Sequence, residues 1–183
     1  MYSYVNSVSE LMHNIIKSNF LKGNNAVDAT LGNGNDTDFL SSHFNKVYAF
    51  DIQISAIHNY SLKEQNNVVL INDSHEYIKE YIQEPIEVFV YNLGFLPGGD
   101  KQITTKSDST IKSINAALDL LSPGGAILIA AYPGHEEGKK EADEILTFAK
   151  NLPKNTYGVM LHSFLNRDKA PMLIIIEKNE VLK

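Results

Sequence analysis

The sequence predicts an α/β fold: a doubly wound, seven-stranded sheet with helices on both faces and a C-terminal antiparallel hairpin. Three observations support this prediction. Short apolar strands alternate with helical segments along most of the chain, which is typical of parallel βαβ units. A glycine-rich turn follows the first strand, where such sheets bind ligands. The last two predicted strands, 157–164 and 172–177, are separated by a short polar loop, which indicates a hairpin.

Length and composition indicate a single domain spanning residues 1–183. Of the 183 residues, 43% are hydrophobic, enough to bury a full sheet between two helical layers. The chain has no cysteine and no histidine pair at metal-binding spacing, so we expect neither disulfides nor a metal site. The N-terminal residues lack a signal-peptide pattern, and no apolar run approaches the roughly 18 residues of a membrane span. We therefore expect a cytoplasmic protein without a membrane partner; a monomer and a homodimer are both open.

Each element follows from a local pattern. Leu11, Met12, Ile15 and Ile16 recur at helical spacing and predict the first helix, and the apolar run IEVFVY predicts a buried strand. The predicted helices span 9–20, 36–42, 54–65, 74–82, 109–121 and 136–150. The predicted strands before the hairpin span 26–30, 46–50, 68–71, 86–91 and 126–132. Parallel βαβ units connected in this order build the sheet.

The glycine turn lies in the segment NAVDATLGNGNDT, residues 25–37. Gly32 and Gly34 allow the backbone to turn sharply and a ligand to lie directly against it. A dinucleotide fingerprint would have a third glycine in place of Thr37 and a pyrophosphate on the helix N-terminus. An NAD-linked reductase is therefore a poor match to this turn.

Carboxylates surround the turn and end the neighbouring strands. Asp28 and Asp36 would repel a pyrophosphate, but they attract the sulfonium and amino group of S-adenosylmethionine. Asp51 ends the second strand, 23 positions after Asp28, near the spacing at which an acid accepts ribose hydroxyls. Asp73 ends the third strand and can accept from the adenine amine. Any one of these residues can instead cap a helix or turn, but together they predict an S-adenosylmethionine site.

The segment YNLGFLPGGDK, residues 91–101, follows the fourth strand, where a transferred group would meet its acceptor. Asn92 and the neighbouring carbonyls can accept hydrogen bonds from an amine and direct its lone pair toward the methyl donor. Asp100 or His135 can then take the departing proton. The alternatives are that Asn92 caps a turn and that His135 begins a helix. The predicted apolar walls of the acceptor slot are Leu93, Phe95 and Leu96.

Several motifs together resemble one known family. The motifs are DATLGNGNDT, FDIQ, NLGFLPGGDK, YPGHEEG and FLNRDKAPMLIIIEK, and they extend over nearly the whole chain. They are similar to those of the YtqB-like family, also known as MnmM and formerly described as rRNA methylases. The resemblance implies a Rossmann-like, class I S-adenosylmethionine-dependent methyltransferase. It also implies a tRNA substrate, methylated in the anticodon stem-loop on the aminomethyl group of 5-aminomethyl-2-thiouridine at the wobble position.

The resemblance implies roles for particular residues. The family's cofactor motif carries onto Asp28, Gly32, Asn33, Gly34, Asp36, Thr37, Asp51, Gln53, Asp73 and Ser74. We add His75 and Asn92 to the predicted cofactor site, and predict catalytic roles for Asn92, Asp100 and His135. The predicted substrate-binding residues are Leu93, Phe95, Leu96, Pro97, Gly98, Lys101, Tyr132 and Arg167.

Recognition of RNA requires aromatic faces for unpaired bases and cations for phosphates. The formal net charge of −6 argues against tight nonspecific nucleic-acid binding. Any affinity for RNA would therefore have to come from a local group of cations. The candidates are Tyr132, Phe95, Lys101, Lys106, Lys112, Arg167 and Lys169. Two alternatives keep the fold: methylation of rRNA or a small amine, and a noncatalytic nucleotide-binding subunit.

Overall fold

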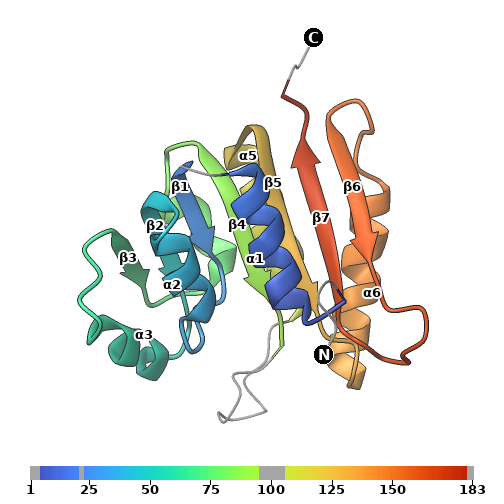
Figure 1. Ribbon diagram of the computed structural model, residues 1–183, viewed down its shortest axis with the longest axis horizontal. Helices are drawn as coiled ribbons and strands as arrows, with labels where there is room; N and C mark the ends of the chain where they lie inside the picture. Colours follow the sequence, from blue (N-terminus) through green and yellow to red (C-terminus); the bar gives the residue numbers. More distant parts are fainter. Residues whose placement is uncertain (1–4, 21–22, 95–105, 181–183) are drawn as a thin grey trace.

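The computed structural model describes residues 5–20, 23–94 and 106–180, which form a seven-stranded mixed sheet between two helical layers (Figure 1). The strands are β1 (Gly23–Asp28), β2 (Phe44–Phe50), β3 (Val68–Ile71), β4 (Ile86–Asn92), β5 (Leu121–Ala131), β6 (Tyr157–His162) and β7 (Met172–Lys178). Their order is β3-β2-β1-β4-β5-β7-β6. The first five strands are parallel to one another, whereas β7 is antiparallel to both β5 and β6. The predicted fold class is therefore confirmed.

The helices connect these strands. They are α1 (Val8–Asn19), α2 (Asn35–Ser41), α3 (Ile54–Ser61), a 3-10 turn η1 (His75–Tyr77), α4 (Ile78–Tyr81), α5 (Ser107–Leu120) and α6 (Glu136–Lys150). The start of α1 is capped by the hydroxyl of Ser7, which accepts a hydrogen bond from the Glu10 backbone N–H at 3.1 Å. None of these helices is long and apolar enough to pass through a bilayer.

Two apolar layers hold the helices to the sheet. On one face, Met12 and Ile16 of α1 and Leu40 of α2 pack against the strands. On the other face, Ile114 of α5 and Ile145 of α6 pack against the opposite side of the same strands. Because alternate residues of a strand point to opposite faces, these nearly continuous apolar strands are covered on both sides. Because helices cover both faces of these strands, a ligand reaches them at their ends.

Several predicted boundaries were wrong. The first strand, predicted over 26–30, spans Gly23–Asp28, and the strand predicted over 157–164 ends at His162. The helix predicted over 54–65 ends at Ser61, and the one predicted over 74–82 is a 3-10 turn followed by one short α-helix. The segment 122–125, which lies between the helix predicted over 109–121 and the strand predicted over 126–132, is part of β5, which begins at Leu121 directly after α5. Gly124 has a φ of 74°, and the register against β4 shifts between Ile86 and Val88, so the strand continues through an irregularity.

Candidate active site

A cavity of about 770 Å³ lies at the carboxyl edge of the sheet, beside the switch in strand order between β1 and β4. The loops after β1, β2, β3 and β4 and the segments before α5 and α6 contribute to its lining. Ligands bind in this position in open α/β sheets. The predicted site residues that line it are Gly32, Asn33, Asp36, Asp51, Gln53, Asp73, Ser74, His75, Asn92, Leu93, Tyr132 and His135.

The glycine turn requires its two glycines. Gly32 and Gly34 have φ values of 51° and 80°, in the left-handed region that glycine adopts without strain. A Cβ built on Gly34 would lie 2.2 Å from the ring of Tyr60, so this position has no room for a side chain. The turn closes with a hydrogen bond of 2.7 Å from the Gly34 N–H to the Leu31 carbonyl.

Asp28 lies beneath this turn and is fully buried. Its carboxylate accepts hydrogen bonds from the Thr37 hydroxyl at 2.6 Å and the Thr30 N–H at 3.0 Å. Burial raises the pKa of Asp28 above its ordinary value, and the negative charge of Asp36 raises it further. Asp28, Gly34 and Thr37 are not among the residues that line the cavity, so their predicted cofactor contact stays a prediction.

Asp51 lies beside the turn at the end of β2. Its two carboxylate oxygens accept hydrogen bonds from the Gly32 N–H at 2.9 Å and the Gln53 N–H at 2.8 Å. These bonds hold the carboxylate against the glycine turn. Each carboxylate oxygen can accept more than one hydrogen bond, so the group can also receive two ribose hydroxyls.

Asp73 and His75 form the next part of the wall. The Asp73 carboxylate accepts from the Ser74 N–H at 2.7 Å and the Tyr81 hydroxyl at 2.6 Å. The His75 ring is buried edge-on against Tyr91, and its Nδ1 is buried with no hydrogen-bond partner among the described residues. Burial lowers the pKa of His75 to about 4, so the ring is neutral at neutral pH. An unpaired buried nitrogen in the cavity wall is an open position for a ligand group.

Asn92 at the end of β4 is held from two sides. Its backbone N–H donates to the Thr30 hydroxyl at 2.8 Å, and its Nδ2 donates to Asp36 Oδ2 at 3.1 Å. A carboxylate only accepts hydrogen bonds, so the Asn92 amide nitrogen faces Asp36, and the acceptor Oδ1 lies on the opposite arm of the carboxamide. The other Asp36 oxygen lies 2.6 Å from His13 Nε2.

His135 begins α6. Its Nδ1 accepts a hydrogen bond of 3.1 Å from the Gly138 N–H, so the neutral ring carries its proton on Nε2. In this state the ring caps a helix, and it could act as a base only if the bond to Gly138 opened. Tyr132, half-buried in the cavity wall, comes directly after β5; burial raises the pKa of its hydroxyl, so it stays protonated.

Some predicted residues lie elsewhere. Arg167 is exposed in the loop between β6 and β7, with its guanidinium 4.4 Å from the centre of the Phe164 ring, and it does not line the cavity. Lys106 and Lys112 do line it, and Lys112 Nζ lies 3.2 Å from Glu76 Oε2. The predicted residues outside the described part of the chain are Phe95, Leu96, Pro97, Gly98, Asp100 and Lys101.

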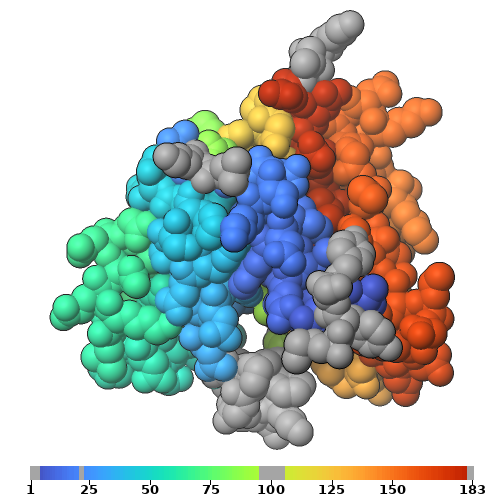
Figure 2. All heavy atoms as spheres, viewed as in Figure 1, coloured from blue at the N-terminus to red at the C-terminus, as the bar shows by residue number. Residues whose placement is uncertain are grey.

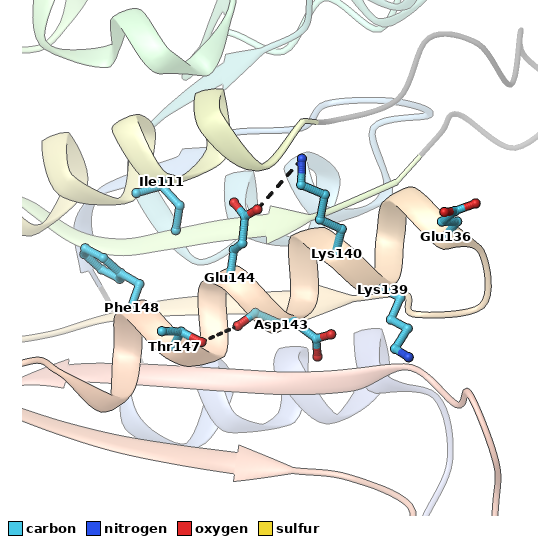
Figure 3. Close-up of a pocket in the computed structure, with 8 residues that line it drawn as sticks. All are labelled: Ile111, Glu136, Lys139, Lys140, Asp143, Glu144, Thr147 and Phe148. Carbon is cyan, nitrogen blue, oxygen red and sulfur yellow. Dashed lines mark hydrogen bonds and ion pairs between the residues drawn. The ribbon is translucent and has the colours of Figure 1, made fainter.

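A second hollow, of about 640 Å³, lies between α5 and α6 (Figure 3). Its charged side chains are of both signs and belong to the surface of α6, where Lys140 and Glu144 are one helical turn apart at 3.9 Å. Ile111 and Phe148 form its apolar part. It contains no strand end and no buried polar group among its lining residues, so we place the candidate active site at the first cavity.

The polar groups of the first cavity fit S-adenosylmethionine. Asp51 has carboxylate oxygens that can accept from ribose hydroxyls, Asp73 and His75 have polar atoms that can face an adenine edge, and Asp36 adds negative charge near the turn; these cofactor contacts stay predictions. Among the described residues no cluster of three or more histidine and acidic side chains could hold a metal ion.

The structure also brings in residues that the sequence did not single out. The hydroxyl of Thr30 accepts a hydrogen bond from the Asn92 backbone N–H, and its place at the end of the first predicted strand was the available signal. Other such residues in the lining are Phe50, Ile52, Glu76, Asp108, Ser109 and Gly134.

Comparison with known proteins identifies the family of this chain. The sequence profile of a family described as "Putative rRNA methylase" matches residues 47–178. A curated relative from Arabidopsis thaliana, the chloroplastic tRNA (mnm(5)s(2)U34)-methyltransferase, is 35% identical over 94% of this chain and 69% of its own length.

Two solved structures are similar over nearly their whole length. One, from Clostridium thermocellum and described as a "putative rRNA-methylase", has 37% identity and a TM-score of 0.90, covering 95% of this chain and 98% of its own. The other, a "putative methyltransferase" from Streptococcus mutans in complex with SAH, has 38% identity and a TM-score of 0.87, covering 95% and 99%. The shared fold and the SAH complex both match the expectation from the sequence.

Proposed function

Since this chain belongs to the "Putative rRNA methylase" family and is an S-adenosylmethionine-dependent methyltransferase, we propose that it methylates tRNA. The acceptor is the aminomethyl group of 5-aminomethyl-2-thiouridine at the wobble position, and the product is the 5-methylaminomethyl nucleoside. The name of the Arabidopsis thaliana relative supports this acceptor. The motifs NLGFLPGGDK and YPGHEEG also support it, because they resemble those of the YtqB-like family.

The observation that carries the proposal is the fixed orientation of Asn92 at the end of β4. Its Nδ2 is bound to Asp36, so Oδ1 is the part of the carboxamide that can accept an N–H from a substrate amine. An amine held in this way directs its lone pair along a defined line, which is the main requirement of a displacement at carbon.

The cofactor, when bound, supplies an electrophilic methyl group on a sulfonium. Asp51 and the Gly32 turn fix where it lies, since the carboxylate and the backbone of the turn are bonded to each other. The acceptor amine must be neutral to react, and an apolar wall such as Leu93 disfavours the charged ammonium. Asp100 and His135 are the proposed proton acceptors, and for His135 this requires the bond to Gly138 to open.

For the RNA, the described lining of the cavity offers the exposed cations Lys106 and Lys112 and the half-buried ring of Tyr132. Lys106 and Lys112 lie at the α5 side, and Tyr132 lies at the β5 side, so a single-stranded anticodon loop could place its base between them. An rRNA substrate is the second candidate, because the family description names rRNA.

The test is methyl transfer from labelled S-adenosylmethionine to three substrates: tRNA from cells that lack this gene, rRNA from the same cells, and a small aliphatic amine. We expect label only in tRNA. Label only in rRNA or in the small amine would contradict the tRNA proposal, whereas no label with SAH binding intact would favour a noncatalytic role.

A further inference from the structure

We infer that His13 is a positioning residue for methyl transfer, acting through Asp36 on the Asn92 carboxamide. The inference rests on the proposed role of Asn92 as the group that holds the substrate amine. His13 lies in α1, which supplies no residue to the cavity lining, and is 23 positions before Asp36 in the sequence.

Two hydrogen bonds connect the three side chains. His13 Nε2 lies 2.6 Å from Asp36 Oδ1, and Asn92 Nδ2 lies 3.1 Å from Asp36 Oδ2. Because a carboxylate only accepts, His13 Nε2 carries a hydrogen toward Asp36 whether the ring is neutral or charged. Asp36 therefore uses one oxygen to bind α1 and the other to bind the end of β4.

The His13 ring is itself held in place. It stacks on Phe39 with the ring centres 4.0 Å apart and the planes 5° from parallel. Phe39 and Asp36 both belong to α2, so the helix that carries the carboxylate also carries the ring that orients its donor. Helices α1 and α2 lie side by side on the face shown in Figures 1 and 2.

The pair is also shielded from water. The side chain of Asp36 is 7% exposed and that of His13 is 25% exposed. A charge-assisted bond in such surroundings is stronger than one at an open surface, and it holds the carboxylate in one rotamer. Without the His13 donor, Asp36 can turn away from Asn92. The Asn92 carboxamide can then rotate by half a turn and present a donor where the substrate amine needs an acceptor.

Two substitutions separate the effect of the His13–Asp36 hydrogen bond from the effect of the packing of His13 against Phe39. His13→Phe keeps a ring to stack on Phe39 but removes the donor, whereas His13→Gln removes the ring and keeps an amide N–H that can reach Asp36. His43 packs against the same Phe39 ring, with centres 4.4 Å apart and the planes tilted by 34°, and its Nδ1 lies 2.8 Å from the Phe39 carbonyl oxygen rather than against Asp36. His43→Phe is therefore the matched control.

For each variant we would measure kcat, KM for tRNA, the affinity for SAH, the melting temperature and the side-chain amide NMR resonance of Asn92. His13→Phe should lower kcat by about 10- to 100-fold, because displacement of a catalytic group by about 1 Å costs that much. It should leave SAH affinity and KM within about threefold, and it should shift the Asn92 amide resonance. His13→Gln and His43→Phe should both resemble the wild type.

A wild-type kcat and an unshifted Asn92 resonance in His13→Phe would overturn the inference. Equal loss of kcat in His43→Phe would also overturn it, because the effect would then come from packing around Phe39. If His13→Phe does not fold, His13→Leu and His13→Gln can be compared instead. Both lack the ring, but only His13→Gln keeps a hydrogen-bond donor for Asp36. If the wild type methylates nothing, the proposed function fails, and the Asn92 resonance alone decides whether His13 orients the carboxamide.

Discussion

The Thr37 hydroxyl donates a hydrogen bond of 2.6 Å to the Asp28 carboxylate, and both side chains are fully buried. This bond connects the end of β1 to the first turn of α2, directly beneath the glycine turn that lines the cavity. The bond favours the ionised form of Asp28, but burial and the charge of Asp36 outweigh it, so the pKa of Asp28 stays raised. The geometry of the turn therefore depends on a buried pair that does not itself line the cavity.

Thr37→Val should lower the free energy of unfolding by about 2 kcal/mol at neutral pH, because the variant keeps the side-chain shape but leaves a buried carboxylate with one bond fewer. Urea denaturation measures this difference. The control is Thr147→Val, which removes an exposed hydroxyl that donates to the Asp143 carbonyl, and it should change stability by less than about 0.5 kcal/mol. Equal free energies of unfolding for the two variants would show that the Asp28–Thr37 bond does not stabilise the fold.

Asp51→Ala should weaken SAH binding by about 10- to 100-fold, since the substitution removes both the proposed ribose acceptor and the bond to the Gly32 N–H. Isothermal titration calorimetry gives the dissociation constant directly. Asp119→Ala removes an exposed carboxylate paired with Lys79 and should bind SAH as the wild type does. An unchanged dissociation constant for Asp51→Ala would exclude the ribose assignment.

Asn92→Ala should lower kcat by about 100-fold or more while SAH affinity changes by less than about threefold, because the lost contact is to the methyl acceptor. Steady-state kinetics with tRNA and calorimetry with SAH measure the two quantities. Asn115→Ala, on the exposed side of α5, provides the control. Full turnover by Asn92→Ala would mean that another group holds the amine.

His75 should make the protein less stable in mild acid. Its pKa is lowered from 6.5 to about 4 by burial, so the unfolded chain takes up the proton first as the pH falls. The contribution of the neutral His75 ring to the free energy of unfolding is fully present above pH 6.5, the pKa of the unfolded state. About 2 kcal/mol of it should be lost between pH 7.5 and pH 5.

Urea denaturation of the wild type and His75→Phe across this range isolates the effect. Acidification acts in the opposite direction on Asp28, whose raised pKa favours the folded state at lower pH, but this contribution is common to both proteins. The wild type should therefore lose stability relative to His75→Phe as the pH falls. A constant difference between the two would contradict the neutral, buried state of His75.

The sequence predicted the fold and the edge of the sheet that carries the site, because both depend on local patterns. Apolar periodicity located every strand, and the positions of Asp51, Asp73 and Asn92 at strand ends follow directly from those strands. The glycine turn was recognisable because the left-handed φ of Gly32 and Gly34 needs glycine.

Relations between distant segments could not be predicted in the same way. His13 is one polar residue on an amphipathic helix, and only the packing of α1 against α2 places it beside Asp36. The hydrogen bond between Asp28 and Thr37 likewise could not be predicted from the place of Asp28 at a strand end. The continuation of β5 through 122–125 was missed because Ser, Pro and Gly usually favour loops, whereas here a shift in register accommodates them.

The most direct test of the account is to determine which atom receives the methyl group. Hypomodified tRNA would be incubated with the protein and S-adenosylmethionine that carries a deuterated methyl, then digested to nucleosides and fragmented by mass spectrometry. We expect one deuterated methyl on the aminomethyl nitrogen of 5-aminomethyl-2-thiouridine, and about 100-fold less of this product in a parallel reaction of the same short duration with Asn92→Ala. A deuterated methyl on a ribose or a base nitrogen, or equal labelling by the Asn92→Ala variant, would contradict it.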